Sequence, residues 1–76
     1  MEASYIVKNS VRLNRIEKKL TQEELAEKVG VTRQTIGLIE KEKYNPTIVL
    51  CLKLCQALDK PLDQLFWLEE ENDEKR

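Results

Sequence analysis

The stretch LTQEELAEKVGVT restricts the possible fold more than any other part of the chain. Thr21 followed three residues later by Glu24 is a capping box, which marks the start of a helix. Gly30 can take the left-handed conformation that ends a helix, and Thr32 is a second N-cap residue. Because only two residues separate the helices, they must cross at a steep angle. The stretch therefore predicts a helix-turn-helix over residues 22–41.

The rest of the chain predicts three more helices. A loosely amphipathic pattern indicates a first helix over residues 9–20. Its expected core-facing residues are Val11, Leu13, Ile16 and Leu20. Thr47 is an N-cap residue for a helix that ends at Leu58 and is apolar on nearly every side, which is typical of a central buried helix. Pro61 opens a last short helix over residues 62–66.

Two segments favour strands instead. SYIVKN near the start and LFWLEE near the end would pair as a small antiparallel ribbon. We therefore predict an all-α fold of five helices that carries a short terminal β-ribbon. A single helix-turn-helix domain would span residues 1–68. Residues 69–76 hold five acidic and two basic side chains and predict a solvated acidic tail rather than a partner-binding segment.

The reactive side chains of the sequence do not form a catalytic set. Histidine is absent, and the only serines are Ser4 and Ser10. Cys51 and Cys55 lie in the apolar fourth helix, where they are expected to act as small buried hydrophobic residues. Two thiols without histidine make only a weak zinc candidate. We expect no enzyme activity, no metal site and no cofactor.

The charge of the chain is −1, but its distribution is uneven. The acidic end carries −3, so residues 1–68 hold 11 basic against 9 acidic side chains. DNA binding requires a local basic surface and not a basic protein, so this balance is compatible with it. No apolar run approaches the length of a membrane span, and no signal peptide is recognisable. We expect a cytoplasmic protein without a membrane partner.

The third predicted helix carries its polar residues on one exposed side. If Ile36 and Ile39 face the core, an advance of about 100° per residue turns Gln34 and Leu38 outward. Arg33 flanks this side near the helix start. Arginine can grip guanine and glutamine can grip adenine, each with two hydrogen bonds. Leu38 would either meet a thymine methyl group or pack beneath a neighbouring loop.

The stretch LTQEELAEKVGVTRQTIGLIEKEKYNP resembles the helix-turn-helix of the Xre/Cro and phage-repressor family of DNA-binding regulators. The matching positions are Gln22, Leu25, Ala26, Val29, Gly30, Val31, Ile36, Ile39 and Glu40. The stretch YNPTIVLCLKLCQALDKPLDQLFWLEEE is similar to the downstream half of small cytolysin-repressor-type members. The resemblance implies a five-helix lambda-repressor-like domain that binds double-stranded DNA and regulates transcription. Glu42 departs from the glycine of many relatives, and Asn14 from a common leucine.

The resemblance also implies which residues contact DNA. The third helix would lie in the major groove, where Arg33 and Gln34 match base-reading positions. Thr32 and Thr35 match backbone or base contacts, and Gln22 would touch the phosphate backbone. The loop residues that would clamp phosphate are Lys43, Tyr44 and Asn45.

The negative charge of Glu40 would repel DNA phosphate unless a cation neutralises it. The resemblance implies an ion pair with Arg15 of the first helix, which would tether the recognition helix. At the C-terminal end, apolar surface from Leu65, Phe66 and Trp67 predicts a homodimer interface. Such a dimer would place two recognition helices about 34–36 Å apart on an inverted repeat, as a repressor does.

A second hypothesis is an antitoxin, or a regulator that binds a protein partner. Antitoxins with this fold usually also bind DNA, so a co-purifying partner protein would distinguish the two hypotheses. The sequence names no effector for either of them.

Overall fold

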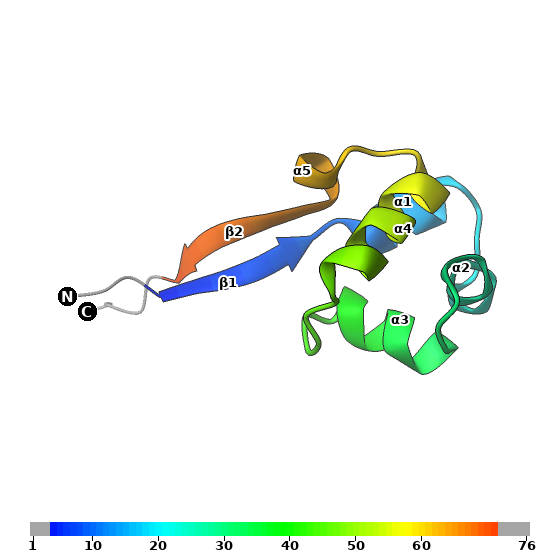
Figure 1. Ribbon diagram of the computed structural model, residues 1–76, viewed down its shortest axis with the longest axis horizontal. Coiled ribbons are helices and arrows are strands. Elements are labelled where there is room, and N and C mark those ends of the chain that lie inside the picture. The colour runs from blue at the N-terminus through cyan, green and yellow to red at the C-terminus, as the bar shows by residue number, and fades with distance from the viewer. Residues whose placement is uncertain (1–3, 72–76) are drawn as a thin grey trace.

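The computed structural model describes residues 4–71, which form five helices and two strands (Figure 1). The helices are α1 (Val11–Glu17), α2 (Gln22–Val29), α3 (Arg33–Glu40), α4 (Ile48–Leu58) and α5 (Leu62–Leu65). The strands are β1 (Ser4–Asn9) and β2 (Phe66–Glu71). The predicted five-helix domain and its β-ribbon are confirmed. No helix within these residues is long and apolar enough to cross a membrane.

Threonine side chains start three of the helices. Thr21 accepts a hydrogen bond from the backbone N–H of Glu24, and the Glu24 carboxylate accepts one from the N–H of Thr21. This is the predicted capping box at the start of α2. Thr32 and Thr47 cap α3 and α4 with one side-chain hydrogen bond each. α2 ends at Gly30, whose φ of 79° lies in the left-handed region that glycine adopts without strain.

The helices enclose one apolar core. Its fully buried side chains are Val11, Leu25, Ile36, Ile39, Leu54, Leu58 and Leu65. α2 packs on α3, and α4 contacts α1, α2 and α5, so every helix contributes to the core. The predicted place of Leu65 in a dimer interface is therefore wrong, because a core this small needs that side chain. Phe66 is half-buried against the core and Trp67 is 42% exposed.

β1 and β2 form an antiparallel ribbon that extends away from the helices (Figure 1). The register pairs Ser4 with Glu71 and Ile6 with Glu69. The first three residues of the predicted acidic tail therefore belong to β2, although their side chains remain in solvent. Pairing with β1 holds their backbone in place. Residues 72–76 of that tail lie outside the described residues.

Polar contacts fix the base of the ribbon to the helices. Asn9 Nδ2 donates a hydrogen bond to the carbonyl of Ile39 at 2.9 Å, at the end of α3. Lys8 Nζ lies 3.3 Å from the Glu42 carboxylate, in the loop that follows α3. The ribbon therefore supports the segment that follows the predicted recognition helix.

α1 is shorter than predicted and turns a different side to the core. Leu13 is 69% exposed and Ile16 is half exposed, whereas Asn14 is buried. Asn14 Nδ2 donates to the backbone oxygen and to the hydroxyl of Ser10, both at 2.8 Å. Because these hydrogen bonds satisfy its amide nitrogen, Asn14 can be buried at little cost. The predicted core positions of Leu13 and Ile16 are wrong.

The composition of α4 predicted a helix that is buried on nearly every side, but one side of α4 is exposed. Its inner side packs into the core, but Ile48, Val49 and Leu52 are at least half exposed. The helices α1, α2 and α5 contact α4, and they leave its outer side uncovered. Nine apolar residues in an eleven-residue helix thus exceed what this small domain can bury.

Candidate nucleic-acid interface

α3 lines a shallow groove with its polar side. Ile36 and Ile39 are fully buried, which fixes the rotation of the helix and turns the opposite side to solvent. The groove is lined by Gln22, Thr32, Arg33, Gln34, Gly37, Leu38 and Lys41. Five of the residues predicted to contact DNA therefore meet in one place. The lining set contains two cations and no acidic side chain, as a surface for phosphate and base edges requires.

The two threonines at the start of α3 also have structural roles. The Thr32 hydroxyl accepts a hydrogen bond from the N–H of Thr35 at 3.3 Å. The two hydroxyl oxygens lie 3.1 Å apart. Thr35 is half-buried and does not line the groove, whereas Thr32 is exposed and does. DNA contact by Thr35 stays a prediction.

The ion pair expected between Arg15 and Glu40 is present beneath this groove. Arg15 Nε lies 2.7 Å from Glu40 Oε2, and Nη2 lies 3.3 Å from Oε1, which is a two-point contact. Arg15 Nη1 donates to the carbonyl of Leu20 at 2.8 Å. The arginine side chain is 11% exposed and the glutamate side chain 3%. The carboxylate at the end of α3 is therefore neutralised and kept from solvent.

Gln22 connects the ion pair to the groove. Its Nε2 donates to Glu40 Oε1 at 3.0 Å, and its Oε1 accepts from Arg33 Nη1 at 3.3 Å. The resemblance implied only a phosphate contact for this residue. In the structure the Gln22 side chain also connects Arg33, the first residue of α3, with Glu40, the last residue of α3. The amide still has a second N–H, which is free to donate to a phosphate oxygen.

The loop after α3 begins with a left-handed residue. Glu42 has a φ of 63°, in the left-handed region that glycine adopts without strain. The backbone N–H of Lys43 donates to the carbonyl of Leu38 at 2.9 Å and closes the end of the helix. The predicted phosphate clamp follows as an exposed segment of Lys43, Tyr44 and Asn45. These residues do not line the α3 groove, so the predicted contacts fall into two separate groups.

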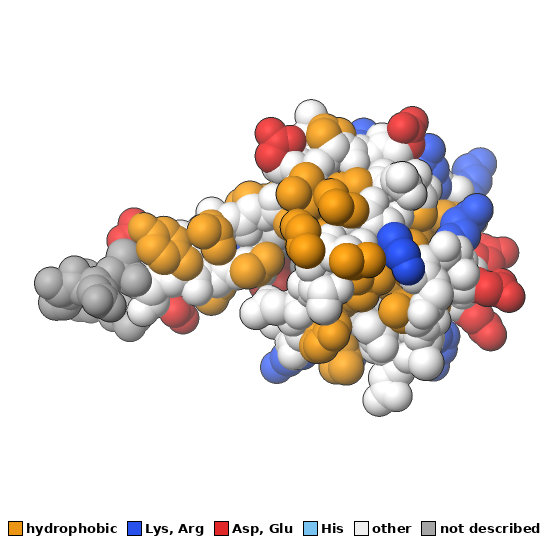
Figure 2. Space-filling model, viewed as in Figure 1, with side chains coloured by type: hydrophobic (Ala, Val, Ile, Leu, Met, Phe, Trp, Pro, Cys, Tyr) orange, Lys and Arg blue, Asp and Glu red, His pale blue; other side chains and the backbone are white. Residues whose placement is uncertain are grey.

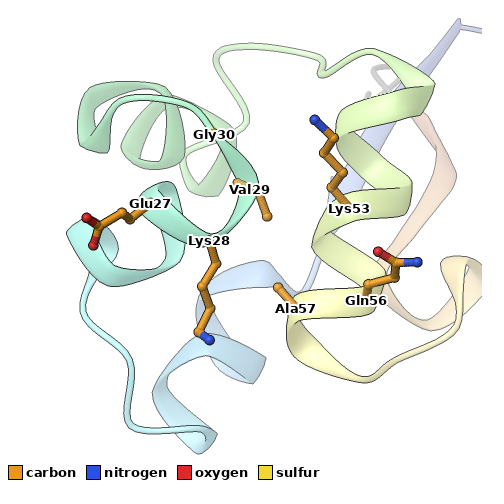
Figure 3. A pocket seen from close by; sticks show the side chains of 7 residues that line it. All are labelled: Glu27, Lys28, Val29, Gly30, Lys53, Gln56 and Ala57. Carbon is orange, nitrogen blue, oxygen red and sulfur yellow. The ribbon is translucent and has the colours of Figure 1, made fainter.

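A second hollow lies between the end of α2 and α4 (Figure 3). It is lined by Glu27, Lys28, Val29, Gly30, Lys53, Gln56 and Ala57. Figure 3 shows that the amino groups of Lys28 and Lys53 point in different directions rather than toward a common point. Because these polar groups do not converge, we favour the α3 groove as the functional site.

The two cysteines pack as the sequence predicted. Cys51 is buried, and Cys55 is partly buried against the core. Burial raises the pKa of both thiols, so the reactive thiolate is disfavoured. Among residues 4–71, no three cysteine, aspartate, glutamate or histidine side chains are grouped so that they could hold a metal ion.

Comparisons with known proteins agree with this geometry. The family model described as helix-turn-helix matches residues 11–65. The uncharacterized HTH-type transcriptional regulator YgzD of Bacillus subtilis is 48% identical over 66 residues, which are 87% of this chain and 100% of the relative. An HTH-type transcriptional regulator of Methanothermobacter thermautotrophicus is 47% identical over 62 residues, which are 80% of this chain and 90% of the relative.

Solved structures are similar to this chain in both fold and sequence. The restriction-modification controller protein C.AhdI from Aeromonas hydrophila superposes with a TM-score of 0.67 and is 37% identical. The match covers 71% of this chain and 78% of C.AhdI. The chain therefore belongs to the Xre-like helix-turn-helix family and is a transcriptional regulator with a DNA-binding domain.

Proposed function

We propose that the protein is a repressor that binds a specific inverted repeat in double-stranded DNA as a homodimer. The observation that carries this proposal is the α3 groove. In it, Arg33 and Gln34 stand exposed on a helix whose other side is anchored in the core. A helix of this diameter fits the major groove of DNA, where each base pair presents a distinct pattern of donors and acceptors.

The side chains of the groove match the chemistry of base edges. Arg33 can donate two hydrogen bonds to guanine, and Gln34 can both donate to and accept from adenine. Leu38 is 39% exposed in the same groove, where an apolar side chain suits a thymine methyl group. A well-formed bidentate contact contributes about 1–3 kcal/mol of discrimination against a wrong base.

The length of α3 argues for two copies on one site. Eight residues form a helix about 12 Å long, which spans roughly four base pairs. A four-base-pair sequence recurs about every 256 positions, too often to stand out among the roughly 10⁶–10⁹ competing sites of a genome. When two half-sites related by a two-fold axis must both match, the recurrence interval of the full site is the square of the interval of one half-site. Occupation of a promoter by such a dimer excludes other proteins from the DNA, which is sufficient for repression.

Selection of bound duplexes from a random library tests this proposal. The expected result is an enriched inverted repeat with half-sites about one helical turn apart. Footprinting of the enriched duplex should then show protection of both half-sites. If no sequence is enriched over random competitor DNA at moderate salt, the protein does not read bases and the proposal fails. Enrichment of a single half-site would support base recognition but contradict binding as a homodimer.

A further inference from the structure

Asn9, the last residue of β1, contacts the point at which the chain leaves α3. Its Nδ2 donates a hydrogen bond to the carbonyl of Ile39 at 2.9 Å. The same carbonyl accepts one from the backbone N–H of Glu42, also at 2.9 Å. A carbonyl near the C-terminus of a helix has no partner within the helix, and its oxygen can accept two hydrogen bonds. Asn9 and the turn after α3 therefore share one acceptor.

The other end of the Asn9 amide is also fixed. Its Oδ1 accepts a hydrogen bond from the backbone N–H of Val11 at 3.0 Å, at the start of α1. Val11 and Ile39 are both fully buried, so the amide connects two positions that the core holds in place. Because both ends of the amide are engaged, its donor stays directed at the end of α3.

The proposed phosphate clamp begins within the turn that Asn9 supports. The backbone N–H of Lys43 donates to the carbonyl of Leu38 at 2.9 Å, so the same turn fixes the backbone of this lysine. Lys8 Nζ lies 3.3 Å from the carboxylate of Glu42. A partly exposed ion pair of this kind adds little to stability. It does balance a negative charge that would otherwise repel phosphate beside Lys43.

The rest of the ribbon is less suited to contact DNA. A hollow between β1 and the loop after α3 is lined by Tyr5, Ile6, Val7, Glu42 and Asn45. Figure 2 shows hydrophobic and acidic side chains along the ribbon. Lys8 is the one basic residue of the two strands. Phosphate contacts come mainly from cations and hydrogen-bond donors, so the base of the ribbon is better suited to hold the loop than the strands are to bind DNA.

We infer that Asn9 is a positioning residue for DNA binding, which fixes the end of α3 and thereby places Lys43 for contact with a phosphate group. This inference rests on the proposed function, because it assumes that the loop after α3 contacts the DNA backbone. It does not concern the choice of bases, which is assigned to Arg33 at the opposite end of α3.

The contact of a lysine with phosphate depends on where its backbone is held. The attraction between two charges falls as their separation increases, and salt weakens it further. A binding group on a loop keeps its place only when residues of fixed conformation support it. Glu42 has a φ of 63°, which is unfavourable for a residue other than glycine. Loss of the Asn9 contact would therefore let the turn relax and move Lys43.

Asn9→Ser tests the inference. A serine hydroxyl can still accept a hydrogen bond from the N–H of Val11 two residues later, but it is too short to reach Ile39. If this variant does not fold, Asn9→Thr replaces it, because threonine suits a strand and has an equally short hydroxyl. Affinity for the selected duplex is measured by fluorescence anisotropy over a series of salt concentrations. Stability is measured by urea unfolding.

Ser10→Ala is the matched control, because it changes the same junction between β1 and α1 without altering a contact to α3. The Ser10 hydroxyl donates to the carbonyl of Gln64 and accepts from Asn14 Nδ2, each at 2.8 Å. The variant should be less stable than the unaltered protein. Its salt dependence of DNA binding should be unchanged.

The measured quantity is the slope of the logarithm of affinity against the logarithm of salt concentration. We expect Asn9→Ser and Lys43→Ala each to reduce this slope by about one, which corresponds to one phosphate contact. The double variant should lose no more than either single variant, because both changes remove the same contact. Base preference at the position read by Arg33 should be retained in Asn9→Ser.

A full salt slope in folded Asn9→Ser, or in Lys43→Ala, would overturn the inference. Additive losses in the double variant would also overturn it, and so would an equal loss in Ser10→Ala. Failure of base-specific selection is a separate result that overturns the proposed function. The slopes are then compared on a duplex of random sequence, because phosphate contacts carry no sequence information.

Discussion

The side-chain amide of Gln22 holds Arg33, since its Oε1 accepts a hydrogen bond from Arg33 Nη1 at 3.3 Å. The same amide donates to Glu40, whose carboxylate pairs with Arg15. Arginine carries about 2 kcal/mol of rotamer entropy, part of which is lost when the side chain is ordered on DNA. A contact that already restricts Arg33 in the free protein reduces that loss. We therefore expect Gln22 to position Arg33 for the proposed base contact.

Replacement of Gln22 by alanine should weaken specific binding without unfolding the protein. Each hydrogen bond of the amide is worth about 1 kcal/mol, so loss of the contact to Arg33 alone corresponds to roughly a fivefold loss of affinity, and loss of a phosphate contact by Gln22 would add to it. Gln64→Ala removes a similar amide from the exposed surface of α5 and should bind as the unaltered protein does. Equal affinities of the Gln22 and Gln64 variants, measured by fluorescence anisotropy, would show that the bridge has no role in binding.

Arg33→Ala and Lys43→Ala should impair DNA binding in different ways. Loss of Arg33 should remove about 1–3 kcal/mol of discrimination at one base position. Loss of Lys43 should weaken binding to all DNA sequences similarly. It should also reduce the slope of the logarithm of affinity against the logarithm of salt concentration by about one. Titrations of the selected duplex and its single-base variants over a series of salt concentrations separate the two effects. Full base preference at every position in Arg33→Ala would refute the reading role.

Glu40→Ala should destabilise the protein strongly. It leaves the Arg15 guanidinium, which is only 11% exposed, without its charged partner. Removal of one member of a buried ion pair costs about 3–5 kcal/mol of unfolding free energy. Glu27→Ala is the control, because this glutamate lies on the exposed side of α2. Urea unfolding curves with the same midpoint for both variants would mean that the pair contributes nothing.

Gly37→Ala should stabilise the protein. A Cβ at this position would meet only Gln22 Nε2, at an ordinary contact distance of 3.8 Å. Alanine is better than glycine inside a helix by about 1 kcal/mol, so the melting temperature should rise. Gly30→Ala should do the opposite, because a φ of 79° strains any side chain there. A fall in the melting temperature of Gly37→Ala would reveal a contact that this geometry does not contain.

The features that the sequence predicted well are set by nearby residues. The capping box at Thr21 and the left-handed end at Gly30 depend on contacts within one helical turn, so short patterns reveal them. The pair of Arg15 and Glu40 spans 25 residues and was expected only from the family resemblance. The bridge made by Gln22 was missed, because no local pattern shows that two distant side chains will share one amide.

The errors concern which apolar residues the fold covers. Leu13 and Ile16 were assigned to the core and Leu65 to a surface, but Leu13 and Ile16 are at least half exposed and Leu65 is fully buried. Apolar periodicity does not record how much area the neighbouring helices can cover. Apolar periodicity also does not indicate that Asn14 takes a buried position in the core. Ser10 makes this burial possible, because it accepts two hydrogen bonds from the Asn14 amide.

Stability should fall in alkaline solution partly because of Cys51. Burial raises the pKa of this thiol above its ordinary value of 9.0, and the neighbouring Cys55 raises it further. Above that ordinary value the unfolded chain loses the proton while the folded chain keeps it, so the folded state binds more protons and stability decreases with pH. The contribution is complete below 9.0 and is lost as pH rises through the raised value of the folded protein.

Urea unfolding of the unaltered protein and of Cys51→Ala tests this dependence between about pH 8 and about pH 10. Lysine and tyrosine side chains also titrate near the upper limit, but they are common to both proteins and cancel in the comparison. The unaltered protein should lose more unfolding free energy over this range than Cys51→Ala does. Parallel pH profiles would mean that the thiol ionises as easily in the folded chain as in the unfolded one.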